Sequence, residues 1–102
     1  MDLINIIERI KAINVRLNAS GLNVDFYFFG SILDNEKNSS DVDVLVIYNH
    51  FSELDLIKFE LSELSIQIPL DLYFMTPEEE VELEFVNRTQ ESLMYFIVVI
   101  AT

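Results

Sequence analysis

Hydrophobic residues at the start of the chain recur at helical spacing, which predicts a helix over residues 3–17. Asp2 suits the N-terminal cap of such a helix, and Gly21 suits its stop. The following segment, 23–29, is rich in aromatic residues with some apolar-polar alternation, so we expect a strand that ends at Gly30. The apolar positions that define the helix are Leu3, Ile6, Ile7, Ile10, Ile13 and Leu17.

The strongest strand signal in the chain is Val42 to Tyr48, where nearly every residue is β-branched or aromatic. Residues 32–40 before it are mainly polar and lack a clear period, so we expect a short helical turn and a loop. The sequence from Ser52 to Asp55 has the form of a capping box, which predicts that a helix opens there. We expect the buried stripe of this helix to consist of Leu54, Ile57, Leu61 and Leu64.

The C-terminal third predicts another strand, a short helix and an apolar tail. We expect a strand over 66–75, interrupted near its start by Pro69. Thr76 to Glu79 forms a second capping box with proline in the first turn, and it predicts a helix that runs to about Arg88. The tail, residues 93–101, is continuously apolar. We expect it either to pair into the sheet as a strand or to be buried against another subunit of a homo-oligomer.

The order of these elements predicts an α/β (α+β) fold, a single domain over residues 1–102 in which helices pack against a sheet. Hydrophobic residues make up 51% of the chain, which is typical of a globular protein. The lack of cysteine excludes disulfides and thiolate metal sites. We find neither a secretory signal nor an apolar run long enough to span a membrane, and we therefore expect a cytoplasmic protein.

Acidic residues dominate the charged positions of the chain. The chain has eighteen Asp and Glu residues and six Lys and Arg residues, which gives a formal net charge of −12. Proteins bind phosphate backbones through Lys and Arg, and no basic stripe can be drawn here, so direct nucleic-acid binding is disfavoured. A basic protein partner or divalent cations suit this charge better.

Three aspartates stand out as candidate site residues. Asp41 and Asp43 are two residues apart at the start of the strongest strand, so alternation places both side chains on one face. Like charges this close raise each other's pKa unless a cation lies between them, and a divalent ion with oxygen ligands is the natural solution. Asp71 puts a third carboxylate inside an apolar strand. The alternative interpretations are a solvated strand end for the pair and a charge that blocks edge pairing for Asp71.

A Gly-Ser turn adds a candidate phosphate site. Gly30 and Ser31 follow the aromatic strand, where backbone N–H groups and a hydroxyl could approach a phosphate closely. Lys37 is the only cation in the loop that follows, so it is either a phosphate contact or a solvated loop lysine.

In combination, these motifs resemble the nucleotidyltransferase superfamily of the DNA polymerase β type, and most closely its minimal, single-domain prokaryotic members. The resemblance spans about residues 23–75, and the residues that carry it are Phe29-Gly30-Ser31, Asp41-Val42-Asp43 and Pro69-Leu70-Asp71-Leu72-Tyr73. It implies a nucleotidyltransferase-like mixed sheet of three to four strands with helices packed against it.

The resemblance also implies roles for these residues. Gly30 and Ser31 would hold a nucleoside triphosphate, and Asp41 and Asp43 would bind the Mg²⁺ or Mn²⁺ ions that bridge its phosphates. Asp71 would bind metal and help to activate the attacking hydroxyl. The implied activity is transfer of a nucleoside monophosphate, for example from ATP, to a hydroxyl, a reaction of the EC 2.7.7 type. In minimal members the acceptor is often a protein, and many act as antitoxins that modify a helical toxin.

The loop departs from the family pattern. The gap between Ser31 and Asp41 is nine residues, one short of the usual spacing, and the arginine that many relatives carry soon after Gly-Ser is missing. These departures leave open a second hypothesis, a catalytically inactive module of the same fold that binds and neutralises a partner protein. A third is an unrelated α/β domain with fortuitous aspartates.

Overall fold

The computed structural model describes residues 3–29, 41–83 and 98–100. In that part of the chain, no helix is long and apolar enough to cross a membrane. The predicted cap at Asp2, the loop 32–40 and the end of the last helix near Arg88 lie outside the described residues. The elements, in chain order, are α1 (Leu3–Ala19), β1 (Asp25–Phe29), β2 (Val42–Ile47), the 3-10 helix η2 (Phe51–Glu53), α3 (Leu54–Gln67), β3 (Leu70–Met75), α4 (Pro77–Leu83) and β4 (Val98–Ile100).

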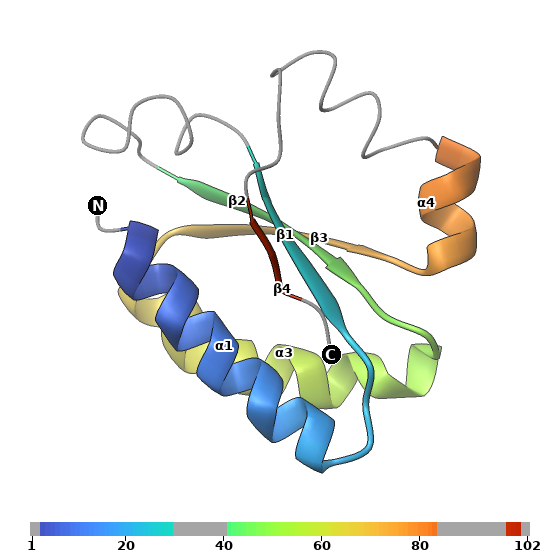
Figure 1. Cartoon of the computed structure of the whole chain (residues 1–102), viewed down its shortest axis with the longest axis horizontal. Coiled ribbons are helices and arrows are strands. Elements are labelled where there is room, and N and C mark those ends of the chain that lie inside the picture. The colour runs from blue at the N-terminus through green and yellow to red at the C-terminus, as the bar shows by residue number, and fades with distance from the viewer. Residues whose placement is uncertain (1–2, 30–40, 84–97, 101–102) are drawn as a thin grey trace.

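The four strands form one mixed sheet in the order β3-β2-β1-β4. Strand β1 pairs antiparallel with β2 and β4, whereas β2 pairs parallel with β3. Because parallel neighbours need a crossover, α3 connects β2 to β3. Helices α1 and α3 lie side by side against one face of the sheet (Figure 1). The predicted α/β class with a mixed sheet and packed helices is confirmed, and Val98–Ile100 of the tail pairs into the sheet.

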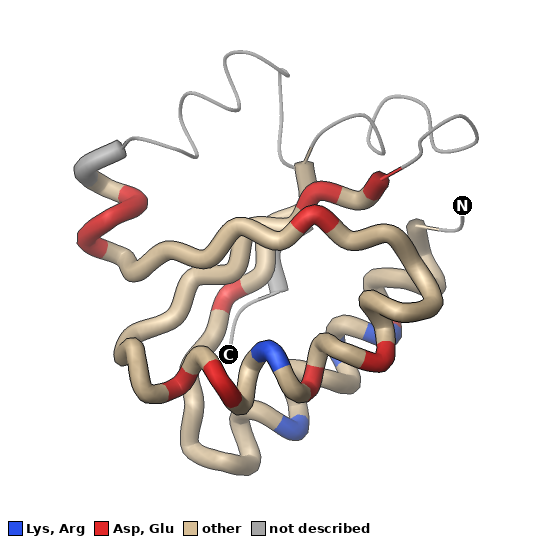
Figure 2. The backbone as a smooth tube through the Cα atoms, turned by 180° about the vertical axis from the view of Figure 1, so that it is seen from behind, with Lys and Arg blue, Asp and Glu red and all other residues tan. Residues whose placement is uncertain are grey.

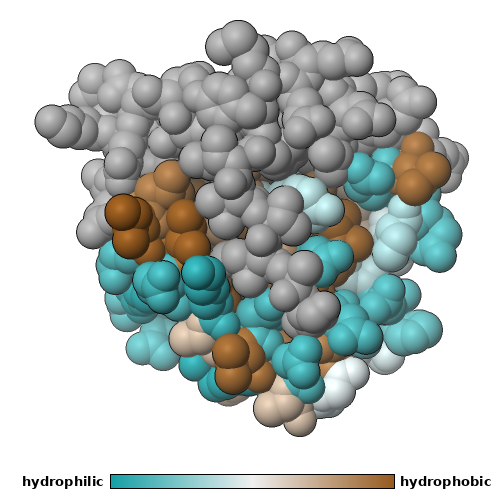
Figure 3. All heavy atoms as spheres, in the orientation of Figure 1, coloured by the Kyte–Doolittle hydropathy of each residue, from teal (hydrophilic) through white to brown (hydrophobic). Residues whose placement is uncertain are grey.

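The main core lies between this helix pair and the sheet. Alternation along β2 sends Val42, Val44 and Val46 into it, while Leu45 and Ile47 join a smaller cluster on the other face. The helices contribute the predicted apolar stripes, and all of the following are buried: Ile6, Ile10, Ile13 and Leu17 of α1, with Ile57, Leu61 and Leu64 of α3. Outside this core, the described surface over the helices is mainly hydrophilic with separate hydrophobic side chains (Figure 3).

Helix α1 ends at the predicted glycine stop. The Leu22 N–H donates to the Leu17 carbonyl at 3.0 Å, and the Gly21 N–H donates to that of Asn18 at 2.9 Å. This pair of bonds is a Schellman motif, and Gly21 has the left-handed φ of 88° that the motif requires. The helix therefore runs two residues past the predicted Leu17, to Ala19.

The second long helix, α3, begins at Leu54, inside the predicted opening from Ser52 to Asp55, but the expected capping contacts were wrong. Helical structure begins earlier, with η2 at Phe51, and Glu53 rather than Ser52 makes the stabilising contacts. The Glu53 carboxylate accepts hydrogen bonds from the backbone N–H groups of Asn49 at 3.1 Å and His50 at 3.0 Å. The capping pattern thus sits two residues before the one expected from the sequence.

The predicted start of the strand over 66–75 was also wrong. Helix α3 continues to Gln67, and the Ile68 N–H still donates to the Leu64 carbonyl at 2.8 Å. Pro69 has no N–H, and it forces extended backbone on the residue before it, so the helix ends there. Strand β3 begins at Leu70.

The second capping box is confirmed at the start of α4. The Glu79 N–H donates to Thr76 Oγ1 at 3.2 Å, and the Thr76 N–H donates to Glu79 Oε1 at 2.9 Å. Pro77 occupies the first helical position, where a missing N–H is harmless. This sharp turn ends β3 and sends α4 away from the sheet (Figure 1).

Candidate active site

Asp43 and Asp71 are neighbours on the face of the sheet opposite the two long helices. In the parallel register of β2 and β3, Asp43 pairs with Asp71, and across the antiparallel pair Asp43 lies opposite Phe29. Because Val42 and Val44 point into the helix-covered core, Asp43 between them points to the other face. Figure 2 shows the acidic residues of β2 and β3 next to each other. The crossover through α3 therefore brings together two carboxylates that are far apart in the sequence.

Asp41 lies just before β2 and is exposed to solvent. Its charge acts on the Asp43 carboxyl. The structure thus pairs two of the predicted aspartates, Asp43 and Asp71, and Asp41 is near enough for its charge to act on Asp43.

The surroundings of Asp43 disfavour its ionised form. Its pKa is raised from the ordinary value of 3.8 to about 6. Burial is the largest cause, followed by the charges of Asp71 and Asp41 and a side-chain hydrogen bond with Asp71. In the described part of the chain, every Lys and Arg lies on α1 or α3, which cover the other face of the sheet. A cation on the carboxylate face would relieve this repulsion.

Tyr73 adds a hydroxyl to the carboxylate pair. It follows Asp71 by two residues on β3, and its O–H donates to Asp71 Oδ2 at 3.4 Å. Burial, the charges of Asp71 and Asp43, and the hydrogen bond to Asp71 raise the pKa of Tyr73, so the phenol keeps its proton at neutral pH. Sequence reasoning missed Tyr73 as a site residue, although the two-residue spacing from Asp71 was a signal that they share a face.

A family model described as the nucleotidyltransferase domain matches residues 7–96. The chain belongs to this family. The match includes all three aspartates and the predicted Gly-Ser turn, and it bears out the resemblance at the level of the superfamily. Comparison with curated proteins gives no match, and comparison with solved structures gives none.

The phosphate-binding residues expected of a nucleotidyltransferase domain are not part of the described structure. Gly30, Ser31 and Lys37 all lie outside the described residues. Their assignment to the triphosphate stays a prediction. Strand β1, the last described element before them, ends at Phe29, which pairs with Asp43.

The described residues of this nucleotidyltransferase domain include no group of three His, Cys, Asp or Glu side chains that could hold a metal ion. What the structure describes is an adjacent pair, Asp43 and Asp71, with Asp41 close enough to act through its charge. Carboxylate oxygens are the ligands that Mg²⁺ prefers, and the mutual repulsion of the pair suits a divalent cation. The donor set therefore fits such an ion, and the predicted three-carboxylate site stays a proposal.

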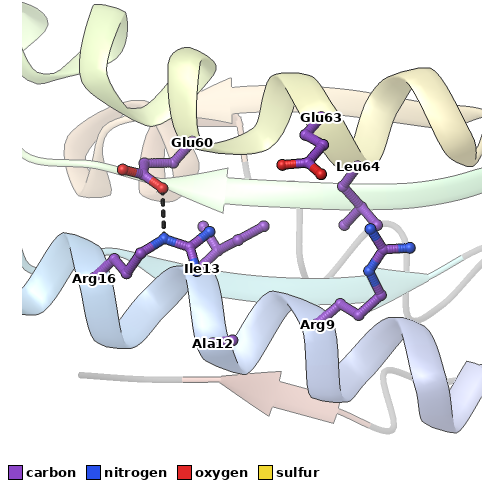
Figure 4. Close-up of a pocket in the computed structure, with 7 residues that line it drawn as sticks. All are labelled: Arg9, Ala12, Ile13, Arg16, Glu60, Glu63 and Leu64. Carbon is purple, nitrogen blue, oxygen red and sulfur yellow. Dashed lines mark hydrogen bonds and ion pairs between the residues drawn. The ribbon is translucent and has the colours of Figure 1, made fainter.

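A pocket of about 200 Å³ lies elsewhere, between α1 and α3. Figure 4 shows Arg9 and Arg16 of α1 extending toward Glu60 and Glu63 of α3. The Arg16 Nε–H donates to Glu60 Oε1 at 2.7 Å, which ties the two helices together. This pocket is on the helix side of the nucleotidyltransferase domain, away from Asp43, so it is separate from the candidate site.

Proposed function

We propose that this protein transfers a nucleoside monophosphate from a nucleoside triphosphate such as ATP to a hydroxyl, with Mg²⁺ or Mn²⁺ as cofactor. The observation that supports this most is the pairing of Asp43 with Asp71 in a chain that belongs to the nucleotidyltransferase domain family. The family match supports the type of reaction, and the pair supplies carboxylates of the kind that a metal-assisted reaction uses.

In this proposal, Asp43, Asp71 and Asp41 hold the cation, and Gly30 and Ser31, with Lys37, contact the triphosphate. When bound, the cation supplies positive charge that offsets the charge of the phosphates during in-line displacement at the α-phosphorus. Asp71 is exposed, so an acceptor hydroxyl can reach it, and its carboxylate orients that hydroxyl and takes its proton. The new bond joins the hydroxyl oxygen to the α-phosphorus, and pyrophosphate leaves.

The acceptor that we propose is a hydroxyl on a partner protein, which would make the protein an antitoxin acting on a basic helical toxin. The formal net charge of −12 supports a basic partner, because opposite charges speed encounter between proteins. It also argues against a second copy of this chain as the partner.

A second candidate function is docking without catalysis, and an exposed face of η2 and α3 favours it. Phe51, Phe59 and Ile66 are 82%, 71% and 86% exposed. At 100° per residue, Phe59 and Ile66 fall within one narrow arc of α3, together with the exposed Asp55 and Ser62, and Phe51 lies in η2 just before this helix. A partner helix with apolar residues flanked by Lys or Arg would fit this face.

Thermal unfolding with added Mn²⁺ or Mg²⁺, with and without ATP, tests the proposed function. We expect metal plus ATP to raise the melting temperature, by the equivalent of roughly 2.7 kcal/mol at a hundredfold excess over Kd. Asp43→Asn should abolish this rise. Asp25→Asn is the matched control, because Asp25 lies on the same sheet face opposite Ile47, at the far end of β2, and should retain it. A folded wild-type protein that shows no rise would favour the docking module.

A further inference from the structure

We propose that Tyr73 is a positioning residue of the candidate active site. Its hydroxyl holds the Asp71 carboxylate beside Asp43, and its ring, braced by Phe29, reaches over β2 next to Asp43. This inference rests on the proposed function, because it concerns how the cation site is prepared.

The strand register shows that the two rings meet over β2. Phe29 on β1 pairs with Asp43, and Tyr73 on β3 pairs with Leu45, so the two aromatic residues flank β2 from opposite sides. Strands separated by one other strand are roughly 9.6 Å apart. The ring centroids are only 5.4 Å apart, with an angle of 51° between the planes, so the side chains lean toward each other above β2.

This ring contact gives Asp43 an apolar neighbourhood on two sides. Phe29 is buried and lies directly beside Asp43, and Leu45 below the contact is fully buried. Asp43 is partly buried as a result, although it lies near the end of a strand. Restricted access of water strengthens the interaction of a carboxylate with a cation.

The hydroxyl of Tyr73 acts on the other carboxylate. Asp71 is exposed, and a free carboxylate at such a position can rotate among several orientations. Donation from the Tyr73 hydroxyl to Asp71 Oδ2 favours one of them. Groups that hydrogen-bond to metal ligands orient them in this way, and their loss lowers metal affinity. Because the bond is 3.4 Å long, we expect a modest effect.

Tyr27 provides a matched control within the same sheet face. It also pairs with Leu45, but from β1 and not from β3. The charges that act on Tyr27 are those of Asp25 and of Glu80 in α4, and not those of Asp43 and Asp71. Its hydroxyl therefore lies nearer to α4 than to the carboxylate pair. Removing the Tyr27 hydroxyl should therefore leave the carboxylate pair unchanged.

The test is the affinity for Mn²⁺, measured by electron paramagnetic resonance of the free ion, in wild type, Tyr73→Phe, Tyr27→Phe and Asp43→Asn. We expect Tyr73→Phe to raise Kd about threefold to tenfold. Removing a group that hydrogen-bonds to a metal ligand typically lowers metal affinity by roughly tenfold to a hundredfold, so this effect would be at or below the low end of that range. Tyr27→Phe should leave Kd unchanged. The melting temperature of metal-free Tyr73→Phe should stay close to that of wild type, because the bond that it loses is long and exposed, and this separates positioning of the site from stability.

Phe29→Leu provides a second variant, because it removes the ring contact but keeps the hydroxyl, and it should also raise Kd. Equal Kd values for Tyr73→Phe and wild type, with binding lost in Asp43→Asn, would overturn the role of Tyr73 and leave the proposed function in place. If wild type binds Mn²⁺ no better than Asp43→Asn, both the proposed function and this inference fail.

Discussion

Asp43 and Asp71 occupy the same level of two parallel neighbouring strands, so their carboxylates share one edge of one sheet face. The α3 crossover imposes this arrangement, because it returns the chain to β3 in the same direction as β2. Asp43 carries a penalty for it, since burial and two nearby negative charges act against its ionised form. A site that destabilises its own protein in this way is typical of a functional constraint.

We expect Asp43→Asn to stabilise the metal-free protein at neutral pH. The pKa of Asp43 is raised from 3.8 to about 6 on folding, so its contribution to stability is fully present below about pH 4 and is lost as the pH rises through 6. The amide does not titrate and escapes this loss. Allowing for solvent screening at a partly exposed site, the gain at pH 7 should be on the order of 1 kcal/mol.

Chemical denaturation of both proteins between pH 3.5 and pH 7.5 measures this effect. The difference in the free energy of unfolding should be near zero at the acid end, grow between pH 4 and 6 and then level off. Asp25→Asn serves as the control and should change stability little. A difference that is constant over the whole range would contradict the assigned environment of Asp43.

The capping box at Thr76 should contribute measurably to stability. Thr76→Ala removes the acceptor for the Glu79 N–H and should lower the free energy of unfolding by about 1 kcal/mol. Ser52→Ala is the matched control, because Ser52 lies in a sequence of the same form but η2 begins before it. Urea denaturation of the two variants compares them directly. Equal losses in the free energy of unfolding for the two variants would contradict this prediction, because Ser52 would then stabilise its helix as much as Thr76 does.

Gly21 should resist substitution because of its backbone conformation alone. A Cβ at Gly21 would meet nothing within 4 Å, so the cost of Gly21→Ala comes from its φ of +88°. We expect a loss of about 1 kcal/mol, and a smaller loss for Gly21→Asn, because asparagine tolerates this region better. Thermal melts of both variants provide the measurement, and an alanine variant at least as stable as the asparagine variant would refute the explanation.

The ion pair between α1 and α3 should contribute little. Arg16 is 54% exposed and Glu60 is 19% exposed, so solvent screens their 2.7 Å contact. Glu60→Gln should cost about 0.5 kcal/mol, less in high salt, whereas the neighbouring Glu63→Gln should cost less still. Denaturation at low and high ionic strength tests the difference. A salt-independent loss would show that the contact acts through packing and not through charge.

Much of the fold could be predicted from periodicity, since apolar residues at helical spacing, Ile6 to Leu17 and Ile57 to Leu64, are buried as expected. Strand alternation likewise predicted that Asp43 would point away from the valines on either side of it, which lie in the helix-covered core. The capping contacts before α3 and the start of β3 could not be predicted, because both depend on competing local bonds. Glu53 accepts hydrogen bonds from backbone groups that precede Ser52. Helical hydrogen bonding continues through the β-branched Ile66 and ends only at Ile68, just before Pro69.

The contact between Phe29 and Tyr73 was beyond sequence reasoning for a different reason. It depends on the pairing of three strands, and register arises from tertiary structure. Tyr73 was therefore only one aromatic residue of an apolar strand until its partner strands were known.

Label transfer from ATP tests the central claim most directly. The protein would be incubated with Mg²⁺, a cell extract and ATP labelled at either the α- or the γ-phosphate, and labelled macromolecules would be separated by size. We expect label from the α-position to become covalently attached, label from the γ-position not to be retained, and both Asp43→Asn and Asp71→Asn to abolish attachment while Asp25→Asn preserves it. Attachment of γ-label, or α-label transfer that survives both substitutions, would contradict nucleotidyl transfer by this carboxylate pair.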